Sequence, residues 1–492
     1  MTSLSQIKEL IKAKGWGGNL DISFSGLHYD SREIKPGDVF VAIKGYKTDG
    51  HQYIRQAVEK GACGIILEQE CPVPEDTPWI KVENSRLALS RLAAFFFNYP
   101  SSGLHVIGVT GTNGKTTTAF LVEKILYATG RKVGLIGTIE NRIAGVPIKT
   151  KFTTPDALEL QELLSRMAGE GADSVVMEVS SHALALHRVA DCEFNGAVFT
   201  NLTQDHLDFH KSTEDYFHAK AGLFKQLGSG DKEGKYAVVN IDSPYAGDII
   251  SLTQVPVITY GIDHGADVAA SNIEVGPRGT SLTVTASGRQ IDLKLKLVGR
   301  FNVYNALAAC GVALMENVDP EIIRTALEET GGIPGRFEAI YEGQPFGVIV
   351  DYAHTPDGLK NILETAREVT KGRVITVFGC GGDRDKTKRP LMGEAVAIYS
   401  DYCIVTSDNP RSEAPGAIIQ DILPGVRKIT EAFKVVENRR EAISEAINMA
   451  GEGDMVVIAG KGHETYQIVG SEVLHFDDRE EARAVLRSLR NP

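Results

Sequence analysis

Cysteine is scarce in this sequence. The six cysteines are Cys63, Cys71, Cys192, Cys310, Cys380 and Cys403. No two of them have C-x-x-C spacing, and none stands in a Cys/His cluster with the spacing of a zinc site. In a chain of 492 residues such thiols are expected to be reduced and mostly buried, which favours a reducing compartment.

A long apolar run is also lacking. The most apolar stretch, residues 87–97, is short and contains Arg91, so it cannot span a bilayer. Residues 1–16 lack the apolar core of a signal peptide. We therefore expect a cytoplasmic protein without membrane insertion.

Basic residues are fewer than acidic residues in this sequence. Lys and Arg number 52 against 64 Asp and Glu, a formal net charge of −12, which argues against a general binder of nucleic acid or acidic membranes. The hydrophobic fraction of 42% and the charged fraction of 24% are ordinary for globular proteins, so disorder is excluded as the main state. At roughly 100–200 residues per domain, the length predicts two to four domains.

The apolar runs divide the chain into three zones, and we expect one α/β domain in each. Residues 1–98 combine short strand-like runs with amphipathic helices. Residues 99–332 alternate apolar strands with helices, which predicts parallel βαβ units, and later contain period-two segments that predict a small antiparallel appendage. Residues 333–492 repeat the order strand, loop and helix, which predicts a doubly wound, Rossmann-like sheet.

A glycine-rich segment, residues 108–117, is the strongest local motif. It lies between an apolar strand and a helix, where backbone N–H groups and the helix N-terminus can surround phosphate oxygens. Lys115 can reach the β- and γ-phosphates, and the Thr116 hydroxyl can ligate Mg²⁺. Val109 stands where the strict phosphate-loop pattern has glycine, so this is a variant loop. Neither a guanine-binding N-K-x-D signature nor a protein-kinase catalytic set is found, which leaves an ATP-using enzyme.

Ionisable side chains follow two further strands of the second zone. Glu178 ends an apolar strand, and its carboxylate is expected to face the phosphate site as an Mg²⁺ ligand. The next strand leads into Asp205, His206, Asp208 and His210, a group that indicates a metal or substrate site. The spacing does not decide between His206 and His210.

Nine motifs spread in order over the chain resemble the Mur ligase family. They are TGTNGKTT, MEVSSHAL, TNLTQDHLDFH, GRFNVYNALAA, PGRFE, DYAHTPDGL, GCGGDRDKTKRP, SDNPRSEAP and AGKGHETYQ. The resemblance implies three domains, which hold a UDP-sugar peptide, ATP and an amino acid respectively. It also implies an ADP-forming ligase of peptidoglycan-precursor synthesis, in which ATP phosphorylates a carboxylate and an amine attacks the acyl phosphate.

The family's ATP and metal sites carry over onto matching positions. The implied ATP-binding residues are Gly111, Thr112, Asn113, Gly114, Lys115, Thr116, Thr117, Asn302, Asn305, Arg336 and Asp351. The implied catalytic residues are Lys115, Glu178, His206 and Lys220. Mg²⁺ would be held by Thr116, Glu178, His206 and Lys220, the last as a carbamate.

The other two substrates of the family carry over in the same way. For UDP-N-acetylmuramoyl-L-alanyl-D-glutamate the implied residues are Ser31, Tyr46, Lys47, Thr48, Thr153, Thr154, Ser180 and Arg188, while Phe152 and Leu186 depart from the family pattern. For meso-2,6-diaminopimelate they are Arg384, Asp408, Asn409, Pro410, Arg411, Gly460 and Glu464. Arg411 would pair with the distal carboxylate that lysine lacks, Arg384 with a carboxylate, and Glu464 with the distal ammonium.

Three alternatives to this interpretation remain. Lysine-adding members of the family lack the arginine that stands here at position 411, and folylpolyglutamate synthetase lacks the N-terminal module. A regulatory P-loop ATPase would not need a set such as Arg384, Arg411 and Glu464 that matches carboxylates and an amine. We expect small-molecule substrates, no nucleic acid, and a monomer.

Overall fold

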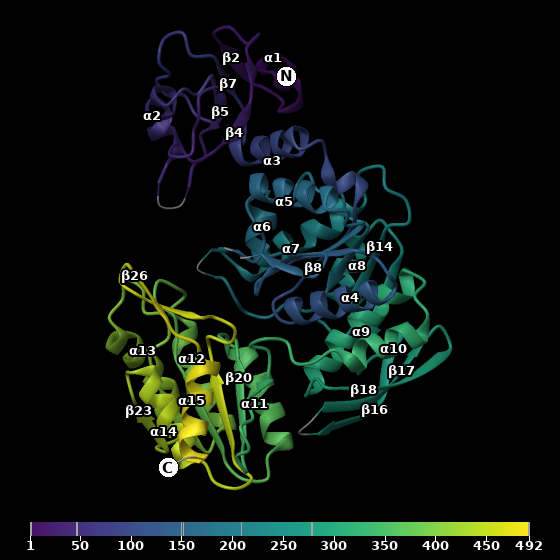
Figure 1. The fold of residues 1–492 in the computed structure, drawn as a ribbon, viewed down its shortest axis with the longest axis vertical. Coiled ribbons are helices and arrows are strands. Elements are labelled where there is room, and N and C mark those ends of the chain that lie inside the picture. The colour runs from purple at the N-terminus through teal and green to yellow at the C-terminus, as the bar shows by residue number, and fades with distance from the viewer. Residues whose placement is uncertain are drawn as a thin grey trace.

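A computed structural model describes residues 2–45, 48–148, 150, 152–207, 209–276 and 279–490. The chain folds into three α/β domains, which follow one another from the top of Figure 1 to the lower left. Within the described ranges, none of the helices combines the length and apolar character needed to cross a membrane. The three-domain α/β architecture is therefore as expected, while the boundaries at 98/99 and 332/333 stay predictions.

The N-terminal domain is built on one sheet with the strand order β2-β7-β6-β5-β4. β4 to β7 pair in parallel and β2 is antiparallel to β7. Its elements are β1 (Thr2–Ser3), α1 (Leu4–Leu10), β2 (Gly15–Gly17), β3 (Ser23–Phe24), β4 (Gly26–His28), β5 (Asp38–Val41), η1 (Gly50–Tyr53), α2 (Ile54–Glu59), β6 (Gly64–Leu67), β7 (Trp79–Lys81) and α3 (Ser85–Phe96). The tyrosine hydroxyl of Tyr29 donates to Glu159 at 2.6 Å and ties this domain to the next.

The central domain is a large sheet with the order β11-β10-β9-β12-β8-β13-β14-β15-β16-β17-β18 among the described residues. Strands β9 to β16 in this order pair in parallel, and both ends of the sheet are antiparallel. Its strands are β8 (His105–Thr110), β9 (Val133–Ile136), β10 (Asn141–Ile143), β11 (Val146–Ile148), β12 (Ser174–Glu178), β13 (Gly196–Phe199), β14 (Tyr236–Asn240), β15 (Val257–Gly261), β16 (Val268–Gly276), β17 (Gly279–Ala286) and β18 (Arg289–Leu295). The predicted antiparallel appendage is thus a continuation of the main sheet, and the β10–β11 hairpin was not predicted.

Helices cover both faces of this sheet, because alternate strand residues are apolar toward each side. Ile107 and Val109 pack toward one face, and Val106 toward the other. The first face carries α4 (Lys115–Ala128), α9 (Arg300–Met315) and α10 (Pro320–Glu329), and the second carries α5 (Ala157–Gly169), α7 (Thr213–Leu227) and α8 (Ala246–Leu252). Two short helices, η2 (Pro100–Gly103) and α6 (Ser181–Ala185), complete the domain.

The C-terminal domain contains the sheet β19-β20-β24-β21-β22-β23 and a separate hairpin, β25-β26. β20 to β23 pair in parallel, as predicted. The strands are β19 (Glu338–Ala339), β20 (Gly347–Asp351), β21 (Val374–Phe378), β22 (Tyr402–Val405), β23 (Phe433–Val435), β24 (Met455–Ala459), β25 (Tyr466–Val469) and β26 (Glu472–His475). One face packs on α11 (Pro356–Val369), α12 (Lys388–Tyr399) and α13 (Pro415–Arg427), and the other on α14 (Arg439–Met449) and α15 (Asp478–Arg490).

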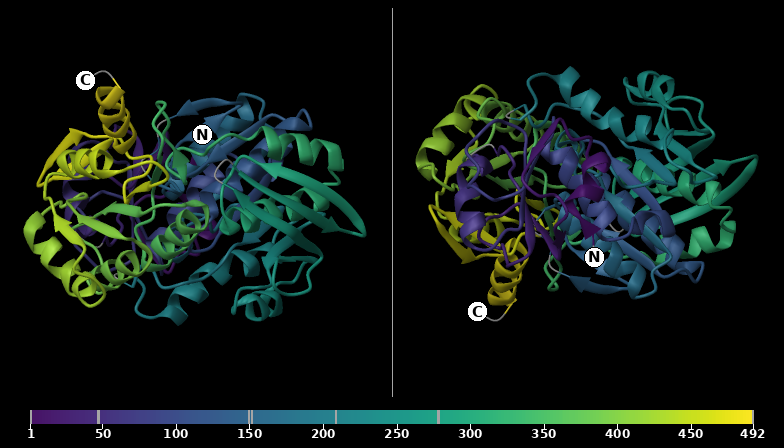
Figure 2. Two further views of the ribbon diagram at one scale, coloured as in Figure 1. Left: turned by 90° about the horizontal axis from the view of Figure 1, so that it is seen from below. Right: turned by 90° about the horizontal axis from the view of Figure 1, so that it is seen from above.

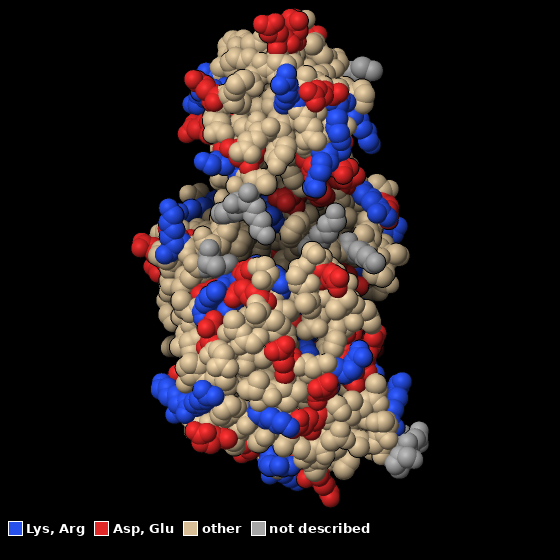
Figure 3. All heavy atoms as spheres, turned by 90° about the vertical axis from the view of Figure 1, so that its left-hand side faces the viewer, with Lys and Arg blue, Asp and Glu red and all other residues tan. Residues whose placement is uncertain are grey.

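The C-terminal domain faces the carboxyl ends of the central strands (Figures 1 and 2). Arg336 Nη2 donates to Thr116 Oγ1 at 3.0 Å, Asn113 Nδ2 donates to Asp357 at 2.8 Å, and Lys388 Nζ lies 3.7 Å from Asp205. Figure 3 shows a hollow between the N-terminal and C-terminal domains, with basic and acidic side chains interspersed around it. Any ligand bound between the domains must therefore be held by local contacts rather than by an electrostatic potential of a single sign.

Candidate active site

The loop between β8 and α4 can exist in this shape because it contains glycine. Gly111 and Gly114 have φ values of +149° and +84°. A Cβ atom would clash with Thr200 Oγ1 at the first position and with Asn305 Oδ1 at the second. The two glycines therefore let the backbone pass close to Thr200 and Asn305, and the start of α4 faces the cavity.

Gly114→Ala is expected to weaken ATP binding by about tenfold or more, because the left-handed backbone and the clash with Asn305 each oppose the native loop. Calorimetric titration with ATP measures the change. Gly169→Ala is the matched control, since a Cβ there meets no atom within 4 Å. Equal ATP affinity in both variants would contradict a phosphate-binding role for the loop.

Two lysines converge on one carbonyl of this loop. Lys115 Nζ donates to Gly111 O at 2.9 Å and to Thr112 O at 2.8 Å, and Lys220 Nζ donates to Gly111 O at 2.7 Å. Burial lowers the pKa of Lys115, and burial together with Lys115 holds the pKa of Lys220 well below its ordinary value. The structure thus places two buried amines with lowered pKa values against the same loop, and their role in phosphate binding stays a prediction.

Glu178, at the end of β12, is a buried carboxylate that lines the site. It accepts hydrogen bonds from Thr116 Oγ1 at 2.9 Å, Thr138 N at 2.7 Å and Thr138 Oγ1 at 3.0 Å. Hydroxyl and carboxylate oxygens are ligands that Mg²⁺ prefers, so the pair Thr116 and Glu178 fits this ion. Over the described residues, no group of three or more His, Cys, Asp or Glu forms a metal site of its own.

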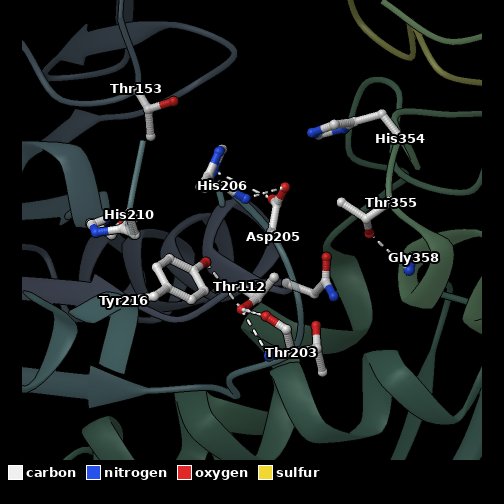
Figure 4. Close-up of polar contacts among 12 residues, drawn as sticks. Thr112, Thr153, Thr203, Asp205, His206, His210, Tyr216, His354, Thr355 and Gly358 are labelled. Carbon is white, nitrogen blue, oxygen red and sulfur yellow. Dashed lines mark hydrogen bonds and ion pairs between the residues drawn. The ribbon is translucent and has the colours of Figure 1, made fainter. Parts of the chain in front are cut away.

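The sequence did not decide between His206 and His210, and the structure gives these two histidines different surroundings (Figure 4). His206 lines the cavity together with Glu178 and Lys220, and its Nε2 lies 3.3 Å from Asp205. Burial lowers the pKa of His206. His210 is buried, with Nε2 3.0 Å from Ser181 Oγ. Asp208 lies outside the described residues, and the choice of His206 as a ligand stays a prediction.

These groups border a cavity of about 520 Å³ between the central and C-terminal domains. Of the residues predicted for ATP, the cavity wall contains Thr112, Asn113, Gly114, Lys115, Thr116, Thr117, Asn305, Arg336 and Asp351. Asn302 lies behind this wall, where its Oδ1 accepts from Asn305 Nδ2 at 3.0 Å. Asp351 accepts from the backbone of Phe337 and Ala353, both at 2.6 Å, which fixes the loop after β20.

A second cavity, of about 570 Å³, lies between the N-terminal and central domains. Ser31, Thr48 and Arg188 line it, as does Leu186. Tyr46 and Lys47 lie outside the described residues. The remaining residues predicted for the same substrate connect the two cavities: Thr153 and Ser180 line the first, while buried Thr154 offers its carbonyl oxygen to Arg188 at 3.0 Å.

Arg188 is held firmly at this junction. Its Nε lies 2.8 Å from Asp156, and its guanidinium lies 5.3 Å from the centre of the Phe152 ring. The departure at Phe152 therefore places an aromatic ring near this arginine.

A third cluster lies in the C-terminal domain, around the loop after β22. Asn409 Nδ2 donates to Glu464 Oε2 at 2.8 Å, and Gly382 N donates to Asn409 O at 2.9 Å. Asp408 faces Gly460, where φ is +118° and a Cβ would come within 2.7 Å of Asp408 Oδ2. The predicted residues of this loop and of the loop after β24 are therefore brought together.

The two arginines of the cluster border Gly381. A Cβ there would lie 2.9 Å from Arg411 Nη1 and 3.8 Å from Arg384 Cγ. Arg411 Nη1 donates to Gly382 O at 2.7 Å, whereas Arg384 is exposed and its Nη1 lies 3.3 Å from Asp383 O. Pro410 is buried and shapes the turn.

Several residues of the sites were missed in the sequence. Lys461 is fully buried, and its Nζ reaches Asn409 Oδ1 at 3.2 Å and Glu464 Oε2 at 3.1 Å. Its place inside AGKGHETYQ was a usable clue, because a lysine between glycines at a strand end can turn inward. The other missed wall residues come from distant parts of the chain: Thr138, Asp242, Tyr304, His354, Asp357 and Asn361.

Comparison with known proteins gives matches over most of the chain. Models described as "Mur ligase family, catalytic domain", "Mur ligase middle domain" and "Mur ligase, glutamate ligase domain" match residues 23–97, 109–313 and 335–462. UDP-N-acetylmuramoyl-L-alanyl-D-glutamate--2,6-diaminopimelate ligases from Syntrophomonas wolfei and Bacillus cereus are 48% and 47% identical to the chain. The alignments cover 96% of both chains in the first case and 94% of both in the second.

Solved structures give the same picture. A structure of a UDP-N-acetylmuramoyl-L-alanyl-D-glutamate--2,6-diaminopimelate ligase is 32% identical, covers 99% of both chains and has a TM-score of 0.69. A MurF ligase from Thermotoga maritima in complex with ADP is 20% identical, covers 96% of this chain and 99% of its own, and has a TM-score of 0.64. At that identity the second likeness concerns the fold alone.

Proposed function

The chain belongs to the Mur ligase family, and we propose on that premise that it joins meso-2,6-diaminopimelate to UDP-N-acetylmuramoyl-L-alanyl-D-glutamate. The reaction consumes ATP and forms ADP, phosphate and an amide. One observation carries the proposal: the cavity lined by the phosphate loop and Lys220 is also lined by Arg336 and Asp351 of the other domain. A site for amide synthesis has to bring an activated carboxylate and an amine together in this way.

The two cavities suggest how the UDP-sugar peptide lies. Its nucleotide end would occupy the cavity lined by Ser31, Thr48 and Arg188, and its peptide would pass Thr153 and Ser180 into the ATP cavity. One of the two free carboxylates of the D-glutamyl residue would then meet the γ-phosphate near Lys115. The lysine ammonium and the backbone N–H groups of the loop stabilise the charge that moves between phosphate oxygens.

Mg²⁺ would be held by Thr116, Glu178 and His206, and it would neutralise negative charge on the ATP phosphates. Lys220 supports a further ligand. Its depressed pKa favours a neutral amine, which is the form that reacts with CO₂ to give a carbamate. The carbamate carries negative charge in place of positive, so it can bind a second Mg²⁺ and relieve the repulsion between Lys220 and Lys115.

The amino acid would be recognised by the cluster around Asn409. Arg411, with its guanidinium oriented by Gly382 O, suits a planar carboxylate, and Glu464 suits an ammonium group. Lysine has no distal carboxylate, so it would leave Arg411 without its partner and should be a poor substrate. This argument favours diaminopimelate over the lysine-adding alternative.

The cellular setting follows from the reaction. We propose a cytoplasmic monomer that acts in peptidoglycan synthesis, and through it in cell-wall growth, cell shape and cell division. Its partners are the three small-molecule substrates.

Phosphate release tests the proposal with each substrate omitted in turn. The full rate of phosphate release is expected with ATP, the UDP-muramoyl dipeptide and meso-diaminopimelate together. With lysine in place of diaminopimelate, the rate should fall to at most a few per cent of that value, because a site built to bind a polar group discriminates strongly against a substrate that lacks it. Release that ignores both the dipeptide and the amino acid would contradict a ligase. Equal use of lysine would contradict the role given to Arg411.

Lys461→Met should raise the KM for diaminopimelate by about tenfold or more and leave the KM for ATP unchanged. The buried ammonium fixes Glu464 and Asn409, so its loss frees both side chains and leaves the carboxylate without a cationic partner. Lys434→Met is the control, because Lys434 pairs with Glu445 on the surface. An unchanged KM for diaminopimelate with a correctly folded variant would contradict this positioning role.

A further inference from the structure

His354 lies in the cavity wall but has no part in the site described so far. It belongs to the loop between β20 and α11, and its imidazole points toward His206 and Asp205 across the cavity (Figure 4). The loop is well fixed. Ala353 N donates to Asp351, and the Thr355 hydroxyl accepts from Gly358 N at 3.0 Å and begins α11.

The tautomer of His354 follows from its backbone contact. Nδ1 lies 2.8 Å from Tyr352 O, and a carbonyl oxygen can only accept, so Nδ1 carries the hydrogen. Nε2 therefore carries a lone pair. The ring also lies against Tyr352, with 4.7 Å between ring centres, so its orientation is restrained on two sides.

Burial favours the neutral form of His354, and the nearby charged groups modify this effect. Burial, with help from Lys388 and Arg336 and against the effect of Asp205, lowers the pKa of His354 to about 4. A neutral imidazole can accept a proton at pH 7. An acyl phosphate bound in the same cavity would add negative charge nearby and raise the proton affinity of the ring.

We propose that His354 is the general base that takes a proton from the ammonium group of the incoming amino acid. This rests on the proposed function, because an amine must be neutral before it can attack an acyl phosphate. Nε2 removes one proton from the ammonium group, and the nitrogen lone pair then forms the bond to the carbonyl carbon. The C–O bond to phosphate breaks with its electron pair, the second N–H proton leaves with the phosphate, and His354 later returns its proton to solvent.

A nucleophile that needs no base separates this role from a structural one. Hydroxylamine is already neutral near pH 7 and converts an acyl phosphate into a hydroxamate plus phosphate. His354→Asn is the informative variant, because an amide N–H can replace the bond to Tyr352 O while the basic nitrogen is lost. His354→Ala, with added imidazole, is the second. His218→Asn is the control, since His218 is an exposed side chain on α7.

We expect His354→Asn to lower amide formation with diaminopimelate by about a hundredfold or more and to keep hydroxamate formation within a few-fold of the unaltered protein. Imidazole should restore part of the amide rate in His354→Ala. A parallel loss of both products, or no loss of either, would overturn the proposal. Absence of ATP-dependent hydroxamate in the unaltered protein would instead overturn the proposed ligase function.

Discussion

Lys220→Ala is expected to lower the rate of amide formation by about a hundredfold or more. The buried amine lies 2.7 Å from Gly111 O, against the phosphate loop, and its depressed pKa favours the form that becomes a carbamate. Removal would eliminate both the donor and the proposed metal-binding carbamate. Steady-state phosphate release measures the loss.

Chemical rescue distinguishes the carbamate from a simple lysine. A short carboxylic acid such as formate or acetate fits the space left by the side chain and supplies the missing carboxylate, so part of the rate should return in Lys220→Ala. Lys225→Ala, at an exposed position on the same helix, should keep full activity and gain nothing from the acid. Full activity of Lys220→Ala without any acid would remove the carbamate hypothesis.

Arg411→Ala is expected to raise the KM for diaminopimelate by about a hundredfold, because truncation of one partner of a buried charge pair costs a few kcal/mol. Arg411 has a left-handed backbone, with φ of +53°, and is held in place by the β25–β26 hairpin. Its N–H donates to Ile468 O at 3.1 Å, and its carbonyl oxygen accepts from Gly470 N at 2.7 Å. The hairpin thus fixes the backbone of Arg411, while Gly382 O holds the guanidinium at 2.7 Å.

The affinity of Arg411→Ala for ATP is the comparison that separates amino-acid recognition from a general loss of structure. ATP affinity, measured by calorimetry, should change less than about twofold, since Arg411 stands apart from the residues that line the ATP cavity. Arg440→Ala, on the surface of the same domain, should leave both constants unchanged. Equal losses of ATP and amino-acid affinity would mean that Arg411 supports the fold of the domain rather than recognition.

The sequence predicted the parallel cores of the central and C-terminal domains well, because each buried strand is a short apolar run that ends in loop residues. It also located the glycine-rich loop between β8 and α4, since glycine spacing and a following helix are local features. The β10–β11 hairpin escaped notice because its strands are short and partly exposed.

Features that depend on tertiary placement could not be predicted. His206 and His210 lie four residues apart, yet only His206 lines the cavity with Lys220 and Glu178, while His210 contacts Ser181. Lys461 stands between glycines at a strand end, but its contacts depend on Asn409 from the loop after β22 as well as on Glu464 of its own loop. Patterns along the chain do not record such contacts.

The proposed reaction is tested most directly by tracing the oxygen atoms of the substrate carboxylate into the products. The UDP-muramoyl dipeptide is prepared with the oxygens of both free carboxylates of its D-glutamyl residue labelled as ¹⁸O, and the phosphate and peptide products of one reaction are examined by mass spectrometry. Attack of the carboxylate on ATP predicts one label in the released phosphate and one in the new amide. Unlabelled phosphate would contradict the acyl-phosphate route and with it the central claim that this site activates a carboxylate for amide synthesis.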